Sequence, residues 1–178
     1  AAGRLAELMK AQLAELNFLD VEFEIAVQRM EEPGADGADD VEFLISTNPG
    51  ESLKPLGRIA SGGELSRVML AIKTVLADQD AIETVIFDEI DTGISGRTAQ
   101  KVSEKLALIG RSRQVICITH LAQLASMADS HYCIEKRAVD GSTQTGIRLL
   151  DEQESVEELA RILGGAQITD AVIDNARE

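Results

Sequence analysis

The sequence is poor in cysteine, histidine and aromatic residues, and each shortage excludes a class of protein. Two cysteines in 178 residues cannot build the disulfide framework of a small secreted domain. Two cysteines and two histidines are also too few for a zinc site of the usual spacing, and no Ser/His/Asp triad emerges. No apolar run approaches the roughly 18 residues that a membrane-spanning helix needs. The chain begins at Ala1 without a basic-then-apolar leader, so we expect a part of a longer protein and not a secreted precursor.

The composition that remains is that of a globular protein, with 44% hydrophobic and 27% charged residues, and the length favours one domain. The net charge of −14 is concentrated in residues 31–42 and 151–178, whereas residues 43–150 are balanced. Because neutralisation of phosphates drives nucleic-acid binding, the chain alone is expected to bind nucleic acid poorly. Cys117 and Cys133 lie in apolar runs, which predicts buried, reduced thiols in a cytoplasmic protein.

The first third of the chain predicts a helix followed by a hairpin. Apolar residues recur at helical spacing in residues 4–16. Two β-type runs follow at 21–27 and 41–47, joined by the acidic, Gly-rich stretch, which predicts an antiparallel hairpin with a mobile tip. Apolar residues at helical spacing return in 62–77 and predict an amphipathic helix.

The rest of the chain alternates between short apolar runs and helical patterns. Runs at 84–87 and 114–119, with helices at 96–108 and 121–128, predict an α/β fold with a mainly parallel sheet that is buried on both faces and flanked by helices. Residues 131–136 and 146–150 are then expected to form an antiparallel pair of strands. Two helices are expected to follow, one over 155–163 that begins at Ser155 and one over 169–177 that begins at Thr169.

The segment Ser61-Gly62-Gly63-Glu64 permits two interpretations. Ser61 as N-cap and Glu64 three residues later form a capping box. That interpretation leaves the glycines unexplained, because each glycine in a first helical turn costs up to about 1 kcal/mol relative to alanine. Two glycines at a helix N-terminus let a ligand approach the free backbone amides, and the ligand bound there is most often phosphate.

Two predicted strands end in polar side chains. Asp88 and Glu89 follow the run at 84–87, and His120 follows the run at 114–119. Ligands of parallel α/β sheets bind at the carboxyl ends of strands. There one acid could hold Mg²⁺ and the other could orient or deprotonate a water, while His120 could donate to a phosphate oxygen. The alternative is that the two acids end the strand in solvent, and for His131 a structural role is expected.

A primary nucleotide cradle is missing from the sequence. The nearest approach to G-x-x-x-x-G-K-[ST] starts at Gly57, but Gly63 and Glu64 stand where lysine and Ser/Thr would be required, and Pro55 precedes it instead of a strand. The chain therefore carries metal-type carboxylates and a phosphate-sensing histidine without a loop to hold the nucleotide.

In this order the motifs resemble the carboxyl-terminal lobe of an ABC-type ATPase head. Residues 61–64 resemble the signature motif, 84–89 Walker B, 90–95 the D-loop, and His120 the switch histidine. The wording RIASGGELSRVMLAIK, FDEIDTGISGRTAQKV, ITHLAQLA and ELARILGG is similar to that of bacterial recombination-repair ATPases related to the structural-maintenance-of-chromosomes (SMC) proteins. The similarity runs from about residue 50 to 165.

The resemblance implies an organisation for the chain. Residues 1–20 would end a coiled coil, and residues 21–178 would form the lobe. Within the lobe, residues 21–49 would be the hairpin, 50–150 the motif-bearing core and 151–178 the terminal helices. The Walker A loop would lie in an amino-terminal lobe of the same protein.

The resemblance also implies the site. ATP and Mg²⁺ are the expected cofactors, with Asp88 supporting the metal, Glu89 activating the attacking water and His120 contacting the γ-phosphate. Ser61, Gly62, Gly63 and Glu64 would bind ATP held by a second head, and Asp91 would cross the dimer interface. DNA would be reached through the full-length protein, which would be cytoplasmic and nucleoid-associated, with no membrane partner.

Three other functions stay open at this point. The same lobe could belong to another SMC-type ATPase or to an ABC transporter. Asp88-Glu89-Ile90-Asp91 also suggests a DExD-type helicase lobe, which would not need the segment at 61–64. The chain could also be a non-catalytic dimerisation module with vestigial acids.

Overall fold

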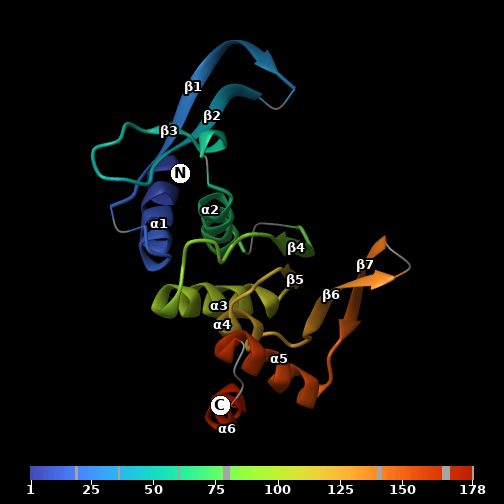
Figure 1. The fold of residues 1–178 in the computed structure, drawn as a ribbon. Helices are drawn as coiled ribbons and strands as arrows, with labels where there is room; N and C mark the ends of the chain where they lie inside the picture. The colour runs from blue at the N-terminus through green and yellow to red at the C-terminus, as the bar shows by residue number, and fades with distance from the viewer. Residues whose placement is uncertain are drawn as a thin grey trace. The chain divides into compact units, whose positions relative to one another are not determined.

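The computed structural model describes residues 1–18, 20–35, 37–59, 61–77, 81–139, 142–165 and 169–177. The chain divides into two compact units, Ala1–Thr119 and His120–Glu178, where its length favoured one domain. Figure 1 shows the elements of both. We describe each unit by itself.

The first unit begins with the expected helix and hairpin. The helix α1 (Ala2–Glu15) buries Met9 and Leu13, with Leu16 just beyond its end, so its apolar stripe becomes core. The strands β1 (Glu22–Gly34) and β2 (Gly37–Ser46) pair antiparallel. A two-residue strand β3 (Lys54–Pro55) extends this sheet, and the short 3₁₀ helix η1 (Leu56–Arg58) follows. The N-terminal helix and the hairpin are confirmed.

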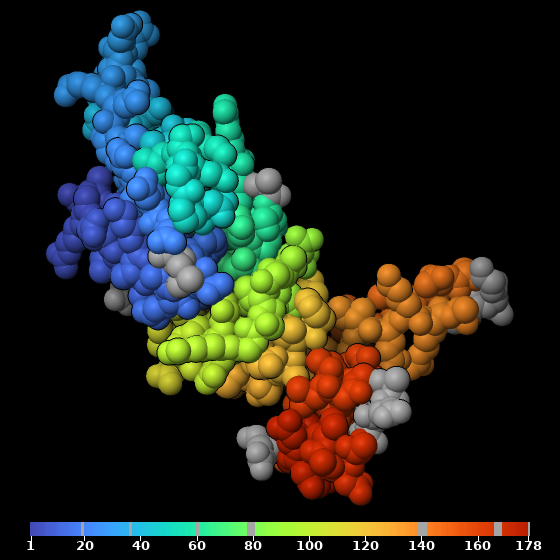
Figure 2. Space-filling view, turned by 60° about the vertical axis from the view of Figure 1, so that its left-hand side comes forward, coloured from blue at the N-terminus to red at the C-terminus, as the bar shows by residue number. Residues whose placement is uncertain are grey.

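The hairpin is longer than its apolar runs. Pairing includes Gln28 with Asp40 and Arg29 with Asp39, and the register shifts between Arg29 and Gly34. Most of the acidic stretch is therefore strand, where a mobile tip was expected; Asp36 lies outside the described residues. Exposed strands carry polar side chains on both faces, so alternation of apolar residues could not mark their full length. In Figure 2 the hairpin projects from the first unit as a narrow blue arm.

The second half of the first unit is the α/β part. It consists of α2 (Gly62–Val75), β4 (Thr84–Phe87), α3 (Gly96–Gly110) and β5 (Gln114–Cys117). Strands β4 and β5 pair parallel, with Phe87 opposite Cys117, as the alternation of apolar runs and helices predicted. Among the described residues β4 and β5 form a two-stranded parallel sheet, and the strands of the other two sheets pair antiparallel.

The expected burial of both faces of this sheet was wrong for the chain as it stands. Phe87 is buried, but Ile86 is 64% exposed and Ile116 43% exposed. One face of β4 and β5 packs against the unit, while isoleucines on the other face meet solvent. Isoleucines exposed in this way are typical of a sheet whose second face is covered by another part of a protein.

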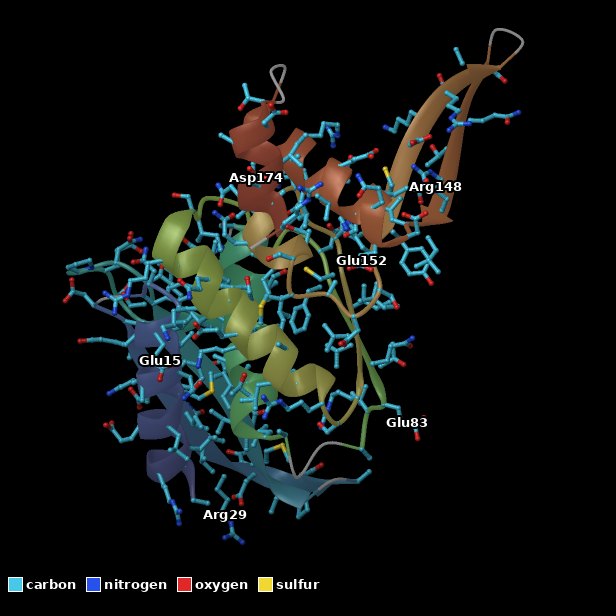
Figure 3. All side chains as sticks on the ribbon, turned by 90° about the horizontal axis from the view of Figure 1, so that it is seen from below. Glu15, Arg29, Glu83, Arg148, Glu152 and Asp174 are labelled. Carbon is cyan, nitrogen blue, oxygen red and sulfur yellow. The ribbon has the colours of Figure 1, made fainter. Side chains whose placement is uncertain are left out.

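The core of the first unit joins helices from distant parts of the sequence. Its fully buried apolar side chains include Leu13, Val68, Leu70, Ile90 and Val102. A buried lysine also joins α1 to α3: Lys105 Nζ donates to Glu15 Oε2 at 2.9 Å and to Gln12 Oε1. Glu15 lies at the end of α1 that reaches α3 (Figure 3).

The described residues of the second unit form three helices and a hairpin. The strands β6 (Tyr132–Val139) and β7 (Ser142–Leu149) pair antiparallel, as expected. The helices are α4 (Ala122–Ala125), α5 (Glu152–Gly164) and α6 (Asp170–Arg177). Ala122, Ala125 and Leu159 form its buried cluster.

Two of its boundaries differ from the prediction. The helix α4 is only one turn long, where eight residues were expected. The helix α5 begins at Glu152, and its N-cap is Asp151 in a full capping box with Glu154, not Ser155. Ser155 Oγ instead bonds His131 Nδ1 at 2.8 Å, which gives His131 the structural role expected of it.

Candidate functional site

The amino end of α2 begins at a capped serine. Ser61 has extended backbone angles, and its Oγ accepts from the backbone N–H of Glu64 at 3.4 Å. Glu64 places a carboxylate in the first turn, where the helix dipole favours negative charge. Gly62 is exposed and Gly63 is buried.

The end of β4 presents the two acids. Asp88 and Glu89 are both exposed, and Asp88 Oδ1 accepts from the backbone N–H of Glu89 at 2.9 Å. Glu89 has a φ of 58°, in the left-handed region that non-glycine residues seldom adopt. A strained backbone of this kind persists only where neighbouring contacts hold it, and such residues cluster at functional sites.

The structure brings the glycine pair and the acid pair together. A Cβ atom on residue 62 would overlap Oε2 of Glu89. A Cβ atom on residue 63 would lie 3.0 Å from the carbonyl oxygen of Glu89 and 2.9 Å from that of Thr92. Packing within the chain therefore explains why these two residues are glycines: the segment after β4 lies directly on the first turn of α2 and leaves no room for a side chain. Approach of a ligand, which the sequence suggested, is not needed to explain them.

Two residues of α2 that the sequence analysis missed hold this segment. Ser66 Oγ donates to the carbonyl of Asp88 at 2.7 Å. The buried guanidinium of Arg67 donates from Nη1 to the carbonyls of Ile90 at 3.2 Å and Thr92 at 2.9 Å. Their positions three and four residues after Gly63 put them on the helix face that carries Gly63, which is the signal that could have identified them.

Asp91 is held inside its own unit. Its side chain is buried at 3% exposure, and its Oδ2 accepts from Thr119 Oγ1 at 2.6 Å, so it joins the end of β4 to the segment after β5. This bond orients Asp91 within its unit. That Asp91 crosses a dimer interface stays a prediction.

The predicted switch histidine lies in the other unit. Thr119 is the last residue of the first unit, and His120, which is exposed, is the first of the second. His120 is therefore described within the second unit only.

The thiol of Cys117 lies close to the acids. Burial first, and then the nearby carboxylates of Asp91 and Asp88, together raise the pKa of Cys117 to about 12. Both cysteines are free and partly buried, where full burial was expected. At neutral pH the Cys117 thiol is protonated and a poor nucleophile.

The acids fit a magnesium ion that is shared with a nucleotide. Within the described parts of the chain, no three His, Cys, Asp or Glu side chains gather into a ready-made metal site. Mg²⁺ is commonly held by one or two carboxylates together with phosphate oxygens and water. Asp88, an exposed carboxylate with one oxygen already oriented, suits such a site.

No described helix has the length and apolarity needed to cross a bilayer.

The chain is similar in sequence to bacterial DNA repair proteins. It is 45% identical to the DNA repair protein RecN of Halalkalibacterium halodurans over 172 residues, which are 97% of this chain and 30% of that protein. It is 51% identical to RecN of Bacillus subtilis over 142 residues, 80% of this chain and 25% of that protein. The chain thus spans about a third or less of the length of the curated relatives it matches. No protein-family model matches it.

Solved structures with a similar fold are SMC head domains. The Smc head domain with a coiled coil and joint from Pyrococcus yayanosii matches with a TM-score of 0.59 and 21% identity over 87% of this chain and 28% of that chain. The Smc head from Pyrococcus furiosus with an extended coiled coil, bound to the C-terminal domain of ScpA, matches with a TM-score of 0.53 and 20% identity over 90% of this chain and 37% of that chain. At this identity the likeness concerns the fold alone.

The fold of the chain is therefore that seen in Smc head domains. The sequence similarity is more specific. The chain is a RecN-type, SMC-like segment.

Proposed function

We propose that this chain is the carboxyl-terminal half of the ATP-binding and hydrolysing head of an SMC-like protein of DNA double-strand-break repair and recombination. The observation that carries the proposal is the junction at which the start of α2 meets Asp88 and Glu89. Exposed carboxylates beside the positive end of a helix dipole supply both signs of charge that a nucleotide triphosphate and its metal ion require. In this function ATP joins two heads, and hydrolysis separates them.

The exposed apolar faces support a head that is completed by another lobe. In the first unit Ile86 and Ile116 lie on the bare face of β4 and β5. In the second unit Tyr132, Ile134, Ile147 and Leu149 are each more than half exposed on the β6–β7 hairpin. A two-stranded hairpin is marginally stable alone. We infer that the lobe carrying Walker A covers apolar surface of this kind.

Each side chain of the junction then has a role. Glu89 orients and deprotonates the attacking water. Outside the junction, in the second unit, His120 is assigned to the γ-phosphate on the resemblance alone. Asp88 would hold Mg²⁺, whose positive charge would offset the negative charge that develops on the phosphate oxygens. Ser61, Gly62, Gly63 and Glu64 form the end of α2 that receives the γ-phosphate of ATP held by a second head. The lobe is acidic, so DNA contact is assigned to other parts of the full-length protein.

Glu89→Gln tests the assigned base. The chain is co-expressed with the amino-terminal lobe of the same protein, and ATP hydrolysis and ATP-dependent dimerisation are measured with Mg²⁺. We expect turnover to fall at least 100-fold while ATP-dependent dimers persist, because the amide keeps the shape of the side chain but cannot accept the proton. Hydrolysis at the wild-type rate would falsify the role of Glu89. Absence of ATP binding by the wild-type head would favour the non-catalytic dimerisation module.

Ser61 offers a test with a matched control. Ser61→Asp and Ser61→Asn both keep a good N-cap, so α2 starts normally in either variant. Only the aspartate adds a negative charge where the γ-phosphate would bind. We expect Ser61→Asp to weaken ATP-dependent dimerisation at least tenfold and Ser61→Asn to change it less than threefold. Equal dimerisation by both variants would exclude phosphate binding at this helix end and would favour a helicase-type lobe.

A further inference from the structure

The guanidinium of Arg67 lies at the meeting point of three segments that are far apart in the sequence. The residue belongs to α2, its acceptors Ile90 and Thr92 follow β4, and the ring of Phe18 follows α1. Arg67 is only 7% exposed, which is rare for an arginine that forms no described ion pair. Such burial needs compensation, because moving a charge out of water is costly.

The compensation comes from carbonyl oxygens and an aromatic face. Nη1 donates at 3.2 Å to Ile90 and at 2.9 Å to Thr92, and the guanidinium carbon lies 5.6 Å from the centre of the Phe18 ring. Among the described atoms its Nε–H finds no acceptor. Desolvation by burial lowers the pKa of Arg67 from its ordinary value, and the Glu64 carboxylate raises it. The site therefore keeps a charged group at an energetic cost.

The hydrogen bonds of Arg67 act next to Glu89, which gives a reason for burying its charge. Ser66 holds the carbonyl of Asp88, the residue before Glu89, and Arg67 holds the carbonyl of Ile90, the residue after it. Glu89 itself has a left-handed backbone, and its carboxylate accepts none of the hydrogen bonds described. Its conformation is thus imposed from both sides by α2, with Arg67 supplying the buried side.

We propose that Arg67 is a positioning residue for ATP hydrolysis, which holds the backbone from Ile90 to Thr92 so that the Glu89 carboxylate stays at the start of α2. The inference rests on the proposed function, in which Glu89 activates the attacking water. Arg67 touches neither nucleotide nor water in this role. It acts on the rate through Glu89.

The test uses Arg67→Met and Arg67→Lys in the head reconstituted with its amino-terminal lobe. Methionine keeps apolar bulk without any donor. Lysine keeps the charge, but its side chain is one atom shorter, so its ammonium reaches the two carbonyls less well. Arg111→Met, at an exposed position after α3, removes the same charge elsewhere. The kcat and KM for ATP are measured per folded head, with the folded fraction taken from thermal unfolding.

We expect Arg67→Met to lower kcat at least tenfold with KM for ATP changed less than twofold, because the nucleotide contacts stay in place. Arg67→Lys should recover part of the loss, and Arg111→Met should match the wild type. If kcat per folded head stays within twofold in Arg67→Met, the positioning role is refuted. If Arg67→Met does not fold, Arg67→Lys decides: a threefold or greater loss of kcat supports the role, and a smaller one overturns it.

Glu89→Gln, measured in parallel, separates the two proposals. Hydrolysis that persists in Glu89→Gln removes the proposed function and the positioning role with it. Loss of hydrolysis in Glu89→Gln together with unchanged kcat in both Arg67 variants removes the positioning role alone.

Discussion

Gly62 and Glu89 lie so close together that a Cβ atom on residue 62 would overlap Oε2 of the glutamate. The overlapping atom is the far end of a flexible side chain, which can turn away at little cost. The neighbouring glycine is different, because a Cβ on residue 63 would meet backbone oxygens of Glu89 and Thr92 at 3.0 and 2.9 Å. Gly62 therefore leaves room for the Glu89 side chain, whereas Gly63 leaves room for the backbone of the segment after β4.

Gly63→Ala should destabilise the head by about 1–3 kcal/mol, because two backbone segments must move apart to admit the methyl group. Urea unfolding of the head measures the change. Gly3→Ala is the matched control: Gly3 lies in the first turn of α1 with no described atom within 4 Å of the added Cβ, so it should gain up to about 1 kcal/mol from helix propensity. Equal effects of the two substitutions would contradict the packing of Thr92 on α2.

Gly62→Ala should instead act on activity. We expect a free energy of unfolding within about 1 kcal/mol of the wild type, because only the Glu89 side chain must move. The displaced carboxylate should lower ATP turnover at least tenfold in the reconstituted head. Stability and steady-state hydrolysis are measured on the same preparation. Full activity in Gly62→Ala would mean that the carboxylate works from another position.

Glu15→Gln should cost about 1 kcal/mol, because it removes the anion 2.9 Å from Lys105, whose side chain is 9% exposed. The cost is moderate because Glu15 is itself half exposed and water screens the pair. Glu7→Gln, on the same helix in an exposed pair with Lys10, is the control and should change stability by less than about 0.5 kcal/mol. Chemical denaturation of both variants distinguishes them, and a Glu15 effect no larger than the Glu7 effect would refute the importance of this contact.

Cys117 should be slow to react with iodoacetamide at neutral pH and should react faster as the pH rises, without a plateau up to pH 10. Its pKa of about 12 keeps the thiol protonated in the folded head, whereas an unfolded thiol ionises near pH 8.5. In a Cys133→Ser background we expect modification at least ten times slower in the folded than in the unfolded protein. A plateau near pH 9 would show an ordinary thiol.

The same shift predicts how stability depends on pH. Below about pH 8.5 both states hold the Cys117 proton, and the contribution is fully present. Between that pH and about 12 the unfolded state loses the proton first, so the free energy of unfolding falls as pH rises. Cys117→Ala should remove this part of the alkaline loss.

Much of the local structure could be predicted because buried apolar residues recur along the sequence with the period of the helix or strand that carries them. The apolar stripe in residues 62–77 identified α2, whose observed range is Gly62–Val75. The two short apolar runs identified β4 and β5, including their parallel pairing. Prediction was weakest where burial is slight. The exposed ends of β1 and β2 have polar side chains on both faces, and the single turn of α4 is too short for a helical period to show.

The sequence alone determined which residues lie at strand and helix ends: Asp88 and Glu89 after β4, Ser61 and the glycines at the start of α2, and His120 after β5. Those positions follow from local hydrogen bonding and from the period of apolar residues. Only the tertiary structure decided that Glu89 rests on Gly62, that Asp91 turns inward to Thr119, and that Arg67 holds the backbone between them. These contacts join residues more than 20 positions apart, and their geometry depends on how α2 packs against the end of β4, which no local pattern records.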